Sequence, residues 1–362
     1  MIKSFKTKSL LLITGSTIFL NACKDTPDAK PSPDVTGSVY VINEGNFGSG
    51  NGSISIYNPQ TKSVSSDPFF AKNGFPAGDV VQSLTLIDSI MYIVVNNSNK
   101  IEIADANTFI TKGSIKDLAL PRNFIKVNSN KAYVSEWVDA FGGQNGRISI
   151  INLTTNTITG SIEVGKYPGP MIILNNKLFL VNNLSNTISV IDPTTDAVVG
   201  TINTRTQPNS IVIDKNNKIW VACGGKKYDE SYSLLPEDQM EAGCLQRIDP
   251  VNNTVEQTFD FGNKTDDIGK MTLNGSKDKL YFLSSYIGSG KVYSFDINNA
   301  AYSSSPVINR DFYGLGVDPL ENKIYTGTYG FSSSQKMIIY NTTGVALDSA
   351  IVGVGPNGFV FK

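Results

Sequence analysis

The feature that most constrains the fold is a strand pattern that occurs seven times along the chain. Each copy has an aromatic residue flanked by aliphatic residues, and successive aromatic positions lie 41 to 61 residues apart. Repeats of this length are typical of solenoids, arrays and β-propeller blades. The aromatic positions are Tyr40, Tyr92, Tyr133, Phe179, Trp220, Tyr281 and Tyr325.

The segments around each aromatic strand complete a four-stranded unit. A second strand follows and ends at Asn or Asp, as in residues 188–192 (ISVID), and a turn such as residues 192–195 (DPTT) leads into a third. Another strand precedes every aromatic strand except the first, and one more, at residues 358–361, ends the chain. We therefore predict an all-β fold, a seven-bladed β-propeller over residues 37–362, whose first blade is closed by the C-terminal strand. Two β-sandwich domains are the alternative, but they do not explain the half-repeat at each end.

The first 22 residues have the pattern of a lipoprotein signal peptide. Three lysines precede an apolar stretch at residues 10–20, which is too short to span a bilayer but fits a secretory signal. Residues 20–23 (LNAC) resemble a bacterial lipobox, which predicts lipidation of Cys23. Ordinary cleavage beside an incidental cysteine is the alternative. Residues 24–34 are small, polar or proline, so we predict that residues 23–36 form a lipidated, flexible tether.

Composition excludes several kinds of chemistry. Removal of residues 1–22 takes away three lysines and no acid, which changes the formal net charge from −1 to −4, so the mature chain lacks a basic surface for nucleic acid. The chain contains no histidine, which excludes a Ser-His-Asp relay and removes the commonest ligand of zinc and copper. Adjacent acids such as Asp266 and Asp267 are more often solvated than catalytic. We predict a binding protein, not an enzyme, with no metal and no cofactor.

Long insertions follow the aromatic strand in five blades, at residues 44–52, 135–146, 224–243, 284–290 and 327–335. In a propeller these loops share one face with the loops that lead into the inner strands. Aromatic side chains give large contact areas with few rotatable bonds, so we predict that this face binds a ligand. Packing of the aromatic rings on their own loops is the alternative. The candidate aromatic residues are Phe47, Trp137, Phe141, Tyr228, Tyr232, Tyr286, Tyr329 and Phe331. Polar partners expected at the channel mouth are Arg122, Asn123, Asn209, Asp266, Asp267 and Arg310.

Cys223 and Cys244 flank the longest insertion. Alignment with the uninterrupted fourth copy places them at the positions of Asn182 and Thr187, which close a hairpin opposite one another. Directly opposed strand residues can meet disulfide geometry, and an exported protein meets an oxidising environment. We predict a disulfide between them; two free thiols are the alternative.

The repeats, with residues 192–195 (DPTT), resemble the YncE-like (YVTN) propeller family over nearly the whole mature chain. Residues 40–46 (YVINEGN), 78–80 (GDV) and 100–105 (KIEIAD) resemble the BtuG-type surface lipoproteins of Bacteroidetes. Residues 23–25 (CKD) resemble the export signal of lipoproteins from that phylum.

The resemblance implies a protein that is lipid-anchored in the outer membrane and faces the cell exterior. It would capture a corrinoid such as cobalamin and pass it to a TonB-dependent transporter. Asn43, Asn46 and Arg122 would donate hydrogen bonds to the rim of the corrinoid, since no histidine is present to ligate cobalt. A glycan-binding surface lipoprotein, a protein–protein interaction scaffold without a small ligand, and an enzyme remain the competing hypotheses.

Overall fold

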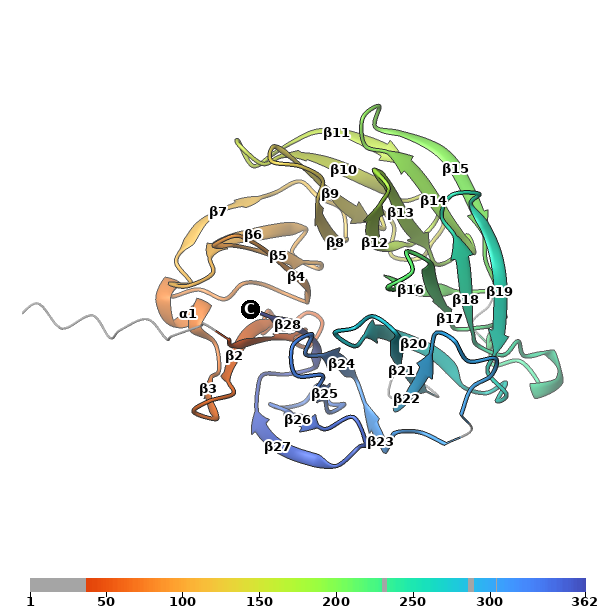
Figure 1. Cartoon of the computed structure of the whole chain (residues 1–362). Coiled ribbons are helices and arrows are strands. Elements are labelled where there is room, and N and C mark those ends of the chain that lie inside the picture. Colours follow the sequence, from red (N-terminus) through yellow and green to blue (C-terminus); the bar gives the residue numbers. More distant parts are fainter. Residues whose placement is uncertain (1–36, 230–232, 286–289, 304) are drawn as a thin grey trace, which may run out of the picture. The chain divides into compact units, whose positions relative to one another are not determined.

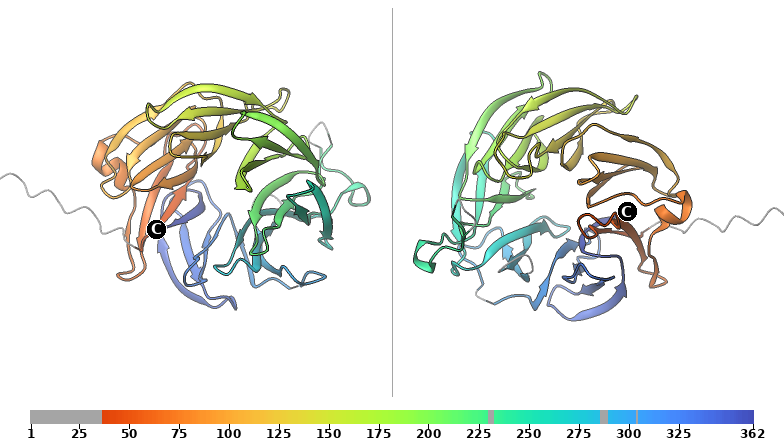
Figure 2. Two further views of the ribbon diagram at one scale, coloured as in Figure 1. Left: turned by 45° about the horizontal axis from the view of Figure 1, so that its top comes forward. Right: turned by 180° about the vertical axis from the view of Figure 1, so that it is seen from behind.

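The chain folds into seven four-stranded antiparallel sheets arranged around a ring (Figure 1). The computed structural model describes residues 37–229, 233–285, 290–303 and 305–362. Figure 2 gives two further views of the same ring of blades. The predicted seven-bladed β-propeller is therefore confirmed. The predicted signal peptide and tether, with Cys23, lie outside the described residues, among which no helix is long and apolar enough to cross a bilayer.

Each blade runs from an inner strand through the aromatic strand to an outer strand. In the first blade the strands are β28 (Pro356–Phe361), β1 (Val39–Asn43), β2 (Ser53–Asn58) and β3 (Ser63–Ser65). The second blade comprises β4 (Val81–Ile87), β5 (Ile90–Val95), β6 (Lys100–Asp105) and β7 (Thr111–Ile115). The third comprises β8 (Pro121–Lys126), β9 (Lys131–Glu136), β10 (Arg147–Asn152) and β11 (Thr157–Glu163). The fourth comprises β12 (Pro168–Leu174), β13 (Lys177–Asn182), β14 (Thr187–Asp192) and β15 (Ala197–Asn203).

The remaining three blades follow the same order. The fifth comprises β16 (Pro208–Ile213), β17 (Ile219–Cys223), β18 (Cys244–Asp249) and β19 (Thr254–Asp260). The sixth comprises β20 (Asp267–Leu273), β21 (Lys279–Ser285), β22 (Gly290–Asp296) and β23 (Ile308–Phe312). The seventh comprises β24 (Gly314–Val317), β25 (Ile324–Gly327), β26 (Lys336–Tyr340) and β27 (Ala346–Ile351).

An Asn or Asp at the end of the third strand, or directly after it in the seventh blade, closes the turn into the outer strand. Its side-chain oxygen accepts a hydrogen bond from the backbone N–H two residues later, at 2.8 to 3.1 Å. This is an Asx turn, in which a side chain replaces a backbone acceptor. The residues that do this are Asn58, Asp105, Asn152, Asp192, Asp249, Asp296 and Asn341.

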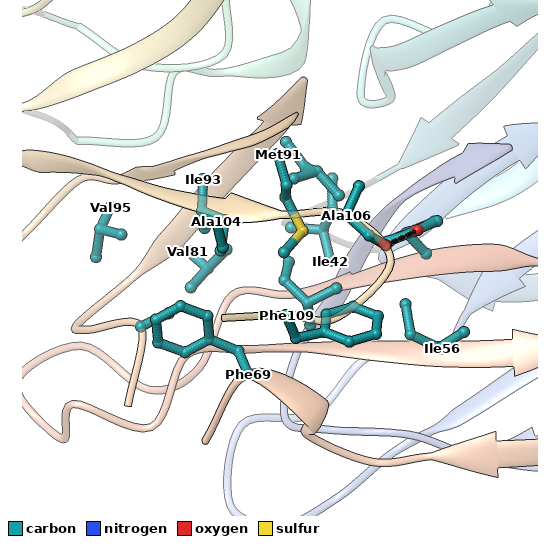
Figure 3. Close-up of a cluster of buried hydrophobic side chains, with 14 residues drawn as sticks. Ile42, Ile56, Phe69, Val81, Met91, Ile93, Val95, Ala104, Ala106 and Phe109 are labelled. Atoms are coloured by element: carbon teal, nitrogen blue, oxygen red, sulfur yellow. Dashed lines mark hydrogen bonds between the residues drawn. The ribbon is translucent and has the colours of Figure 1, made fainter. Parts of the chain in front are cut away.

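The core is divided into seven apolar clusters, each shared by two neighbouring blades. The predicted aromatic residues are buried in these clusters, with Tyr92 the most exposed at 6%. Burial of one such side chain stabilises the fold by about 2 to 3 kcal/mol. Figure 3 shows the cluster between the first two blades, where Ile42 and Ile56 of the first meet Met91 of the second. The packing between blades therefore depends on the repeated strand pattern.

The C-terminal strand closes the ring as predicted. β28 pairs antiparallel with β1, with Val360 opposite Tyr40 and Phe361 opposite Val39. Phe359 and Phe361 also pack against the cluster that joins the first and seventh blades. The two ends of the propeller thus share one sheet, which removes the open seam that an unclosed ring would have.

Two short helical segments interrupt the strand pattern and were not predicted. α1 (Pro68–Asn73) begins at Asp67, whose side chain accepts a hydrogen bond from the N–H of Phe70. It places Phe69 in the cluster between the first two blades (Figure 3). The 3₁₀ turn η1 (Glu237–Gln239) lies in the longest insertion. A helix of six residues is too short to produce a detectable helical period.

Candidate ligand site at the channel mouth

The seven inner strands surround a central cavity of about 640 Å³. It lies at the end of the ring where the inner strands begin, which is the face that carries the long insertions. Every inner strand contributes at least one lining residue. One from each strand, in chain order, gives Gln82, Arg122, Gly169, Asn209, Lys270, Leu315 and Asn357.

Backbone bulges turn polar side chains toward this cavity. In six inner strands the pairing with the aromatic strand shifts register near the first residues. A bulge leaves an extra residue unpaired and re-aims its side chain. The single extra residues are Gln82, Arg122, Asn209 and Asn357, and the remaining bulges contain Gly169 with Pro170 and Gly269 with Lys270.

Strained backbone adjoins the bulges. Val80, Leu120, Tyr167 and Gln207 each stand directly before an inner strand, with φ between 52° and 61°. This left-handed conformation costs a residue with a Cβ roughly 1 to 2 kcal/mol. Strain of this kind clusters at functional sites because the surrounding structure has to enforce it. Here it places Val80, Leu120 and Tyr167 in the walls of cavities at the mouth.

A second cavity of about 420 Å³ adjoins the first on the rim of blades one to three. Arg122 and Trp137 line both cavities, so the two spaces are adjacent and share these side chains as a common wall. The β1–β2 loop supplies Glu44 to Phe47, and Phe331 comes from the β25–β26 loop of the seventh blade. Insertions distant in sequence therefore meet at one edge of the mouth.

Trp137 is held between a cation and another ring. The Tyr167 ring stacks on the indole at 4.0 Å between centroids and 4° between planes, and the Arg122 guanidinium carbon lies 3.9 Å from the indole centroid. Groups this close to the same centroid have to occupy opposite faces of the indole. A ligand would therefore meet the edge of Trp137, whose buried Nε1 has no hydrogen-bond partner among the described residues.

A polar network extends from the rim cavity into the central cavity. The Tyr313 hydroxyl donates to the Glu44 carboxylate, and Asn357 Nδ2 donates to the same oxygen at 3.4 Å. Lys270 Nζ donates to the Asn357 carbonyl at 2.7 Å and lies 4.2 Å from the Tyr313 ring centroid. Burial raises the pKa of Tyr313, and the charge and hydrogen bond of Glu44 raise it further, so Tyr313 stays a neutral donor.

Burial lowers the pKa of both cations in the mouth. It lowers the pKa of Arg122 to about 10, against the favourable charge of Glu44. The pKa of Lys270 falls to about 8, because burial and the positive charge of Arg122 outweigh the attraction of Glu44. At neutral pH both side chains are still protonated, so the mouth contains two cations and the single carboxylate of Glu44.

The structure places the predicted residues unevenly. Asn46, Phe47, Arg122, Trp137 and Phe331 line the two cavities, and Phe47 is 74% exposed. Tyr329 lies beside them and packs edge-on against Phe331 and Tyr313. Phe141, 86% exposed, and Tyr228 line neither of these two cavities. Tyr232 and Tyr286 lie outside the described residues.

Asn43 is a correction to the prediction. Its side chain is fully buried, and Nδ2 donates to the Ser53 hydroxyl at 3.2 Å and to the Ser55 hydroxyl at 2.9 Å. It therefore stabilises the first blade and cannot donate to a ligand. Its neighbour Glu44, not selected from the sequence, lines the rim cavity.

The polar residues expected at the mouth divide in the same way. Arg122, Asn123 and Asn209 line the central cavity as predicted. Asp266 lines a separate cavity on the outer strands, and Asp267 forms an ion pair with Lys227 at 3.6 Å. Arg310 was placed wrongly. It belongs to the outer strand β23, since that strand extends to Phe312 and leaves one residue before β24.

Cys223 and Cys244 are directly opposed in the β17–β18 pair, as predicted. Both are fully buried, and the structure has them as free cysteines without a bond. The contact with Cys244, together with burial, raises the pKa of Cys223. The position predicted for the pair is confirmed, and the disulfide itself stays a prediction.

The sequence of most of the propeller matches a known family. A model of DUF5074, described as a domain of unknown function, matches residues 37–348. The chain belongs to the DUF5074 family. No curated protein matches the sequence of this DUF5074 propeller.

The solved structures that are similar to this DUF5074 propeller belong to proteins with different named activities. A quinonprotein alcohol dehydrogenase-like protein from Bacteroides thetaiotaomicron is 15% identical with a TM-score of 0.64, over 90% of this chain and 78% of that one. The periplasmic gluconolactonase of Pseudomonas aeruginosa is 10% identical with a TM-score of 0.66, over 90% and 98% of the chains. Hydrazine synthase of Kuenenia stuttgartiensis is 14% identical with a TM-score of 0.56, over 75% and 85%. These similarities show the fold alone, and the closer likeness to YncE-like and BtuG-type propellers stays a prediction.

Proposed function

We propose that this DUF5074 propeller is a lipid-anchored surface protein that captures a corrinoid, such as cobalamin, at the channel mouth. The observation that carries the proposal is the pair of adjacent cavities, of about 640 and 420 Å³, that share Arg122 and Trp137 as a common wall. Small-molecule sites are concave, mostly preformed, and combine apolar walls with a few placed polar groups. We propose that the site binds its ligand without catalysis, because the chain contains no histidine to act as a general base.

The composition of the walls suits a broad amphipathic ring with amide substituents. Phe47 and Phe331 offer apolar contact from two loops, and Gln82, Asn209 and Asn357 offer amide groups from the inner strands. The Oε1 of Gln82 and the Oδ1 of Asn209 are buried without hydrogen-bond partners among the described residues. Unsatisfied buried acceptors cost about 1 to 3 kcal/mol each, so a ligand that donates to them would recover that energy.

Calorimetric titration with cyanocobalamin tests the proposal. We expect binding at micromolar or tighter concentrations, and we expect Trp137→Ala to weaken it by more than fivefold, or over 1 kcal/mol. The indole supports Arg122 and separates the two cavities, so its loss disturbs both. Leu320→Ala is the control, because Leu320 is 89% exposed in the β24–β25 loop on the opposite face. Absence of heat with any corrinoid would refute the proposal and leave glycan binding or a protein scaffold.

The anchor and the hand-over to a TonB-dependent transporter are separate parts of the proposal. Incorporation of labelled palmitate that disappears in Cys23→Ser would support the anchor. A photoreactive residue at position 47, on the exposed rim, should crosslink to the outer-membrane transporter in intact cells. Crosslinks at the rim to other proteins alone would contradict the hand-over without affecting ligand capture.

A further inference from the structure

The channel mouth contains more positive than negative charge. Lys270 and Arg122 both line the central cavity, and neither forms an ion pair with a carboxylate among the described residues. Lys270 contacts a backbone carbonyl and the Tyr313 ring, while Arg122 contacts the Trp137 ring. Partly buried cations are normally paired, because removal of their hydration is costly. These two are held by groups that do not neutralise them.

The carboxylate of Glu44 already has other hydrogen-bond partners. Glu44 accepts hydrogen bonds from the Tyr313 hydroxyl and from Asn357 Nδ2. It stabilises both cations at longer range, but it leaves the three charged groups with one excess positive charge. The Trp137 Nε1–H, beside Arg122, is a further buried donor without an acceptor among the described residues. The mouth thus offers one excess positive charge and a neutral donor that has no acceptor among the described residues.

We infer that an acidic group of the ligand, a phosphate or a carboxylate, enters the central cavity and is held by Lys270 and Arg122. This inference rests on the proposed ligand-capture function and adds a requirement on the ligand. Oxyanions make charge-assisted hydrogen bonds with both kinds of side chain, and these are stronger than neutral ones. A ligand that also carries amide or hydroxyl donors would satisfy the Gln82 and Asn209 oxygens in the same cavity.

Two fluorescent probes test the inference without reference to any corrinoid. 8-Anilinonaphthalene-1-sulfonate and N-phenyl-1-naphthylamine share an aromatic skeleton, and only the first carries an anion. We expect Lys270→Met and Arg122→Met each to weaken binding of the sulfonate by about tenfold, since one charge-assisted hydrogen bond is lost, and to leave the neutral probe unchanged. Inorganic phosphate or acetate in molar excess should displace the sulfonate, and the stronger competitor identifies the acid. Equal sulfonate affinity in wild type and both variants would overturn the inference.

A conservative variant and a control at an exposed lysine keep the test decisive. Lys270→Arg retains the charge and should retain the sulfonate preference, which a loss of folding would not. Lys264→Met removes an exposed lysine from the loop before β20 and should change neither probe. Loss of sulfonate binding in Lys264→Met as well would contradict a specific site.

The affinity for the sulfonate should also fall as the pH rises from about 8, the pKa of free Lys270. A bound anion raises the pKa of Lys270 in the complex. The contribution of Lys270 to the sulfonate affinity is therefore complete below pH 8 and is lost as Lys270 deprotonates at higher pH. Glu44, Arg122, Tyr313 and Asn357 surround Lys270. The pKa of Tyr313 lies far above this range and that of Arg122 is about 10, so Lys270 is the first cation of the mouth to lose its charge. A pH-independent affinity would contradict the role of Lys270.

Corrinoids then separate the inference from the proposed function. Cyanocobalamin contains a phosphodiester that dicyanocobinamide lacks, so wild type should bind the first about tenfold more tightly, and Lys270→Met should remove the difference. Equal binding of both corrinoids would overturn the inference and leave the proposed function standing. Failure of both to bind, with the sulfonate behaving as expected, would refute the corrinoid and support the anion site.

Discussion

Lys270→Met should stabilise the ligand-free protein at neutral pH. Burial lowers the pKa of Lys270 from 10.5 to about 8, which corresponds to about 3 kcal/mol of folding free energy that the charged form costs. Methionine retains the apolar stem but loses the hydrogen bond from Nζ to the Asn357 carbonyl, worth about 1 kcal/mol. The expected net gain at pH 7 is therefore about 2 kcal/mol, or about 3 °C in melting temperature for a propeller of this size.

The pH dependence gives the sharper test of this reasoning. Between pH 8 and 10.5 the unfolded state binds a proton at Lys270 that the folded state has released, so the stability of the wild type rises with pH across this window. The difference between variant and wild type should shrink there and reverse above pH 10.5, where only the lost hydrogen bond remains. Comparison of the two proteins cancels the titration of shared groups that do not interact with Lys270. Arg122 does interact with it and has a pKa of about 10, so the slope between pH 8 and 9 carries the test.

Melting temperatures of wild type, Lys270→Met and Lys264→Met across pH 7 to 11 provide the measurement. The control removes an exposed lysine and should change stability by less than about 0.5 kcal/mol. An equal effect of Lys270→Met at pH 7 and pH 10.5, or no gain at pH 7, would refute the claim that Lys270 is a costly buried charge. If Lys270→Met is more stable than wild type at pH 7 and has lost anion binding, Lys270 serves binding at the expense of stability.

Two further predictions concern buried pairs away from the mouth. In oxidised, unfolded protein we expect Cys223 and Cys244 to show no reactive thiol until reductant is added, because their strand positions are directly opposed; two reactive thiols would disprove the disulfide. We expect Glu136→Gln to lower the free energy of unfolding by about 2 kcal/mol in chemical denaturation, since its fully buried carboxylate pairs with Arg147 at 2.9 Å. Asp88→Asn, in an exposed 3.9 Å pair, should cost less than 0.5 kcal/mol, and equal costs would contradict the argument.

The fold could be predicted because its determinants are local and repeated. The buried aromatic position recurs in every blade, and the Asn or Asp at the end of the third strand makes its hydrogen bond within the turn. Closure of the ring followed from a count of strands at the two ends, and the pairing of Val360 with Tyr40 confirms it. α1 was not predicted because its six residues bury only Pro68 and Phe69, which is too few apolar positions to show a helical period.

The site could be predicted only in outline. Loop length identified the face that carries the two cavities, but length does not say where a side chain points, so Phe331 lines the rim cavity while Phe141 does not. Lys270 and Gln82 were missed because a bulge breaks the alternation that assigns side chains to faces. Tyr167 was missed because its position depends on a left-handed backbone, which glycine, asparagine or aspartate would have indicated and tyrosine does not.

The same bulges explain how a repeated fold acquires an individual site. A regular inner strand would present alternate side chains to the channel and leave every blade equivalent. A bulge near the start of six inner strands replaces this regularity at one end of the ring with an unpaired position whose side chain the blade core does not constrain. Arg122, Asn209 and Asn357 occupy such positions, so these residues can vary with the ligand while the strands behind them keep the ring closed. The strained residues before the inner strands, such as Val80, are then the local cost of holding those side chains in place.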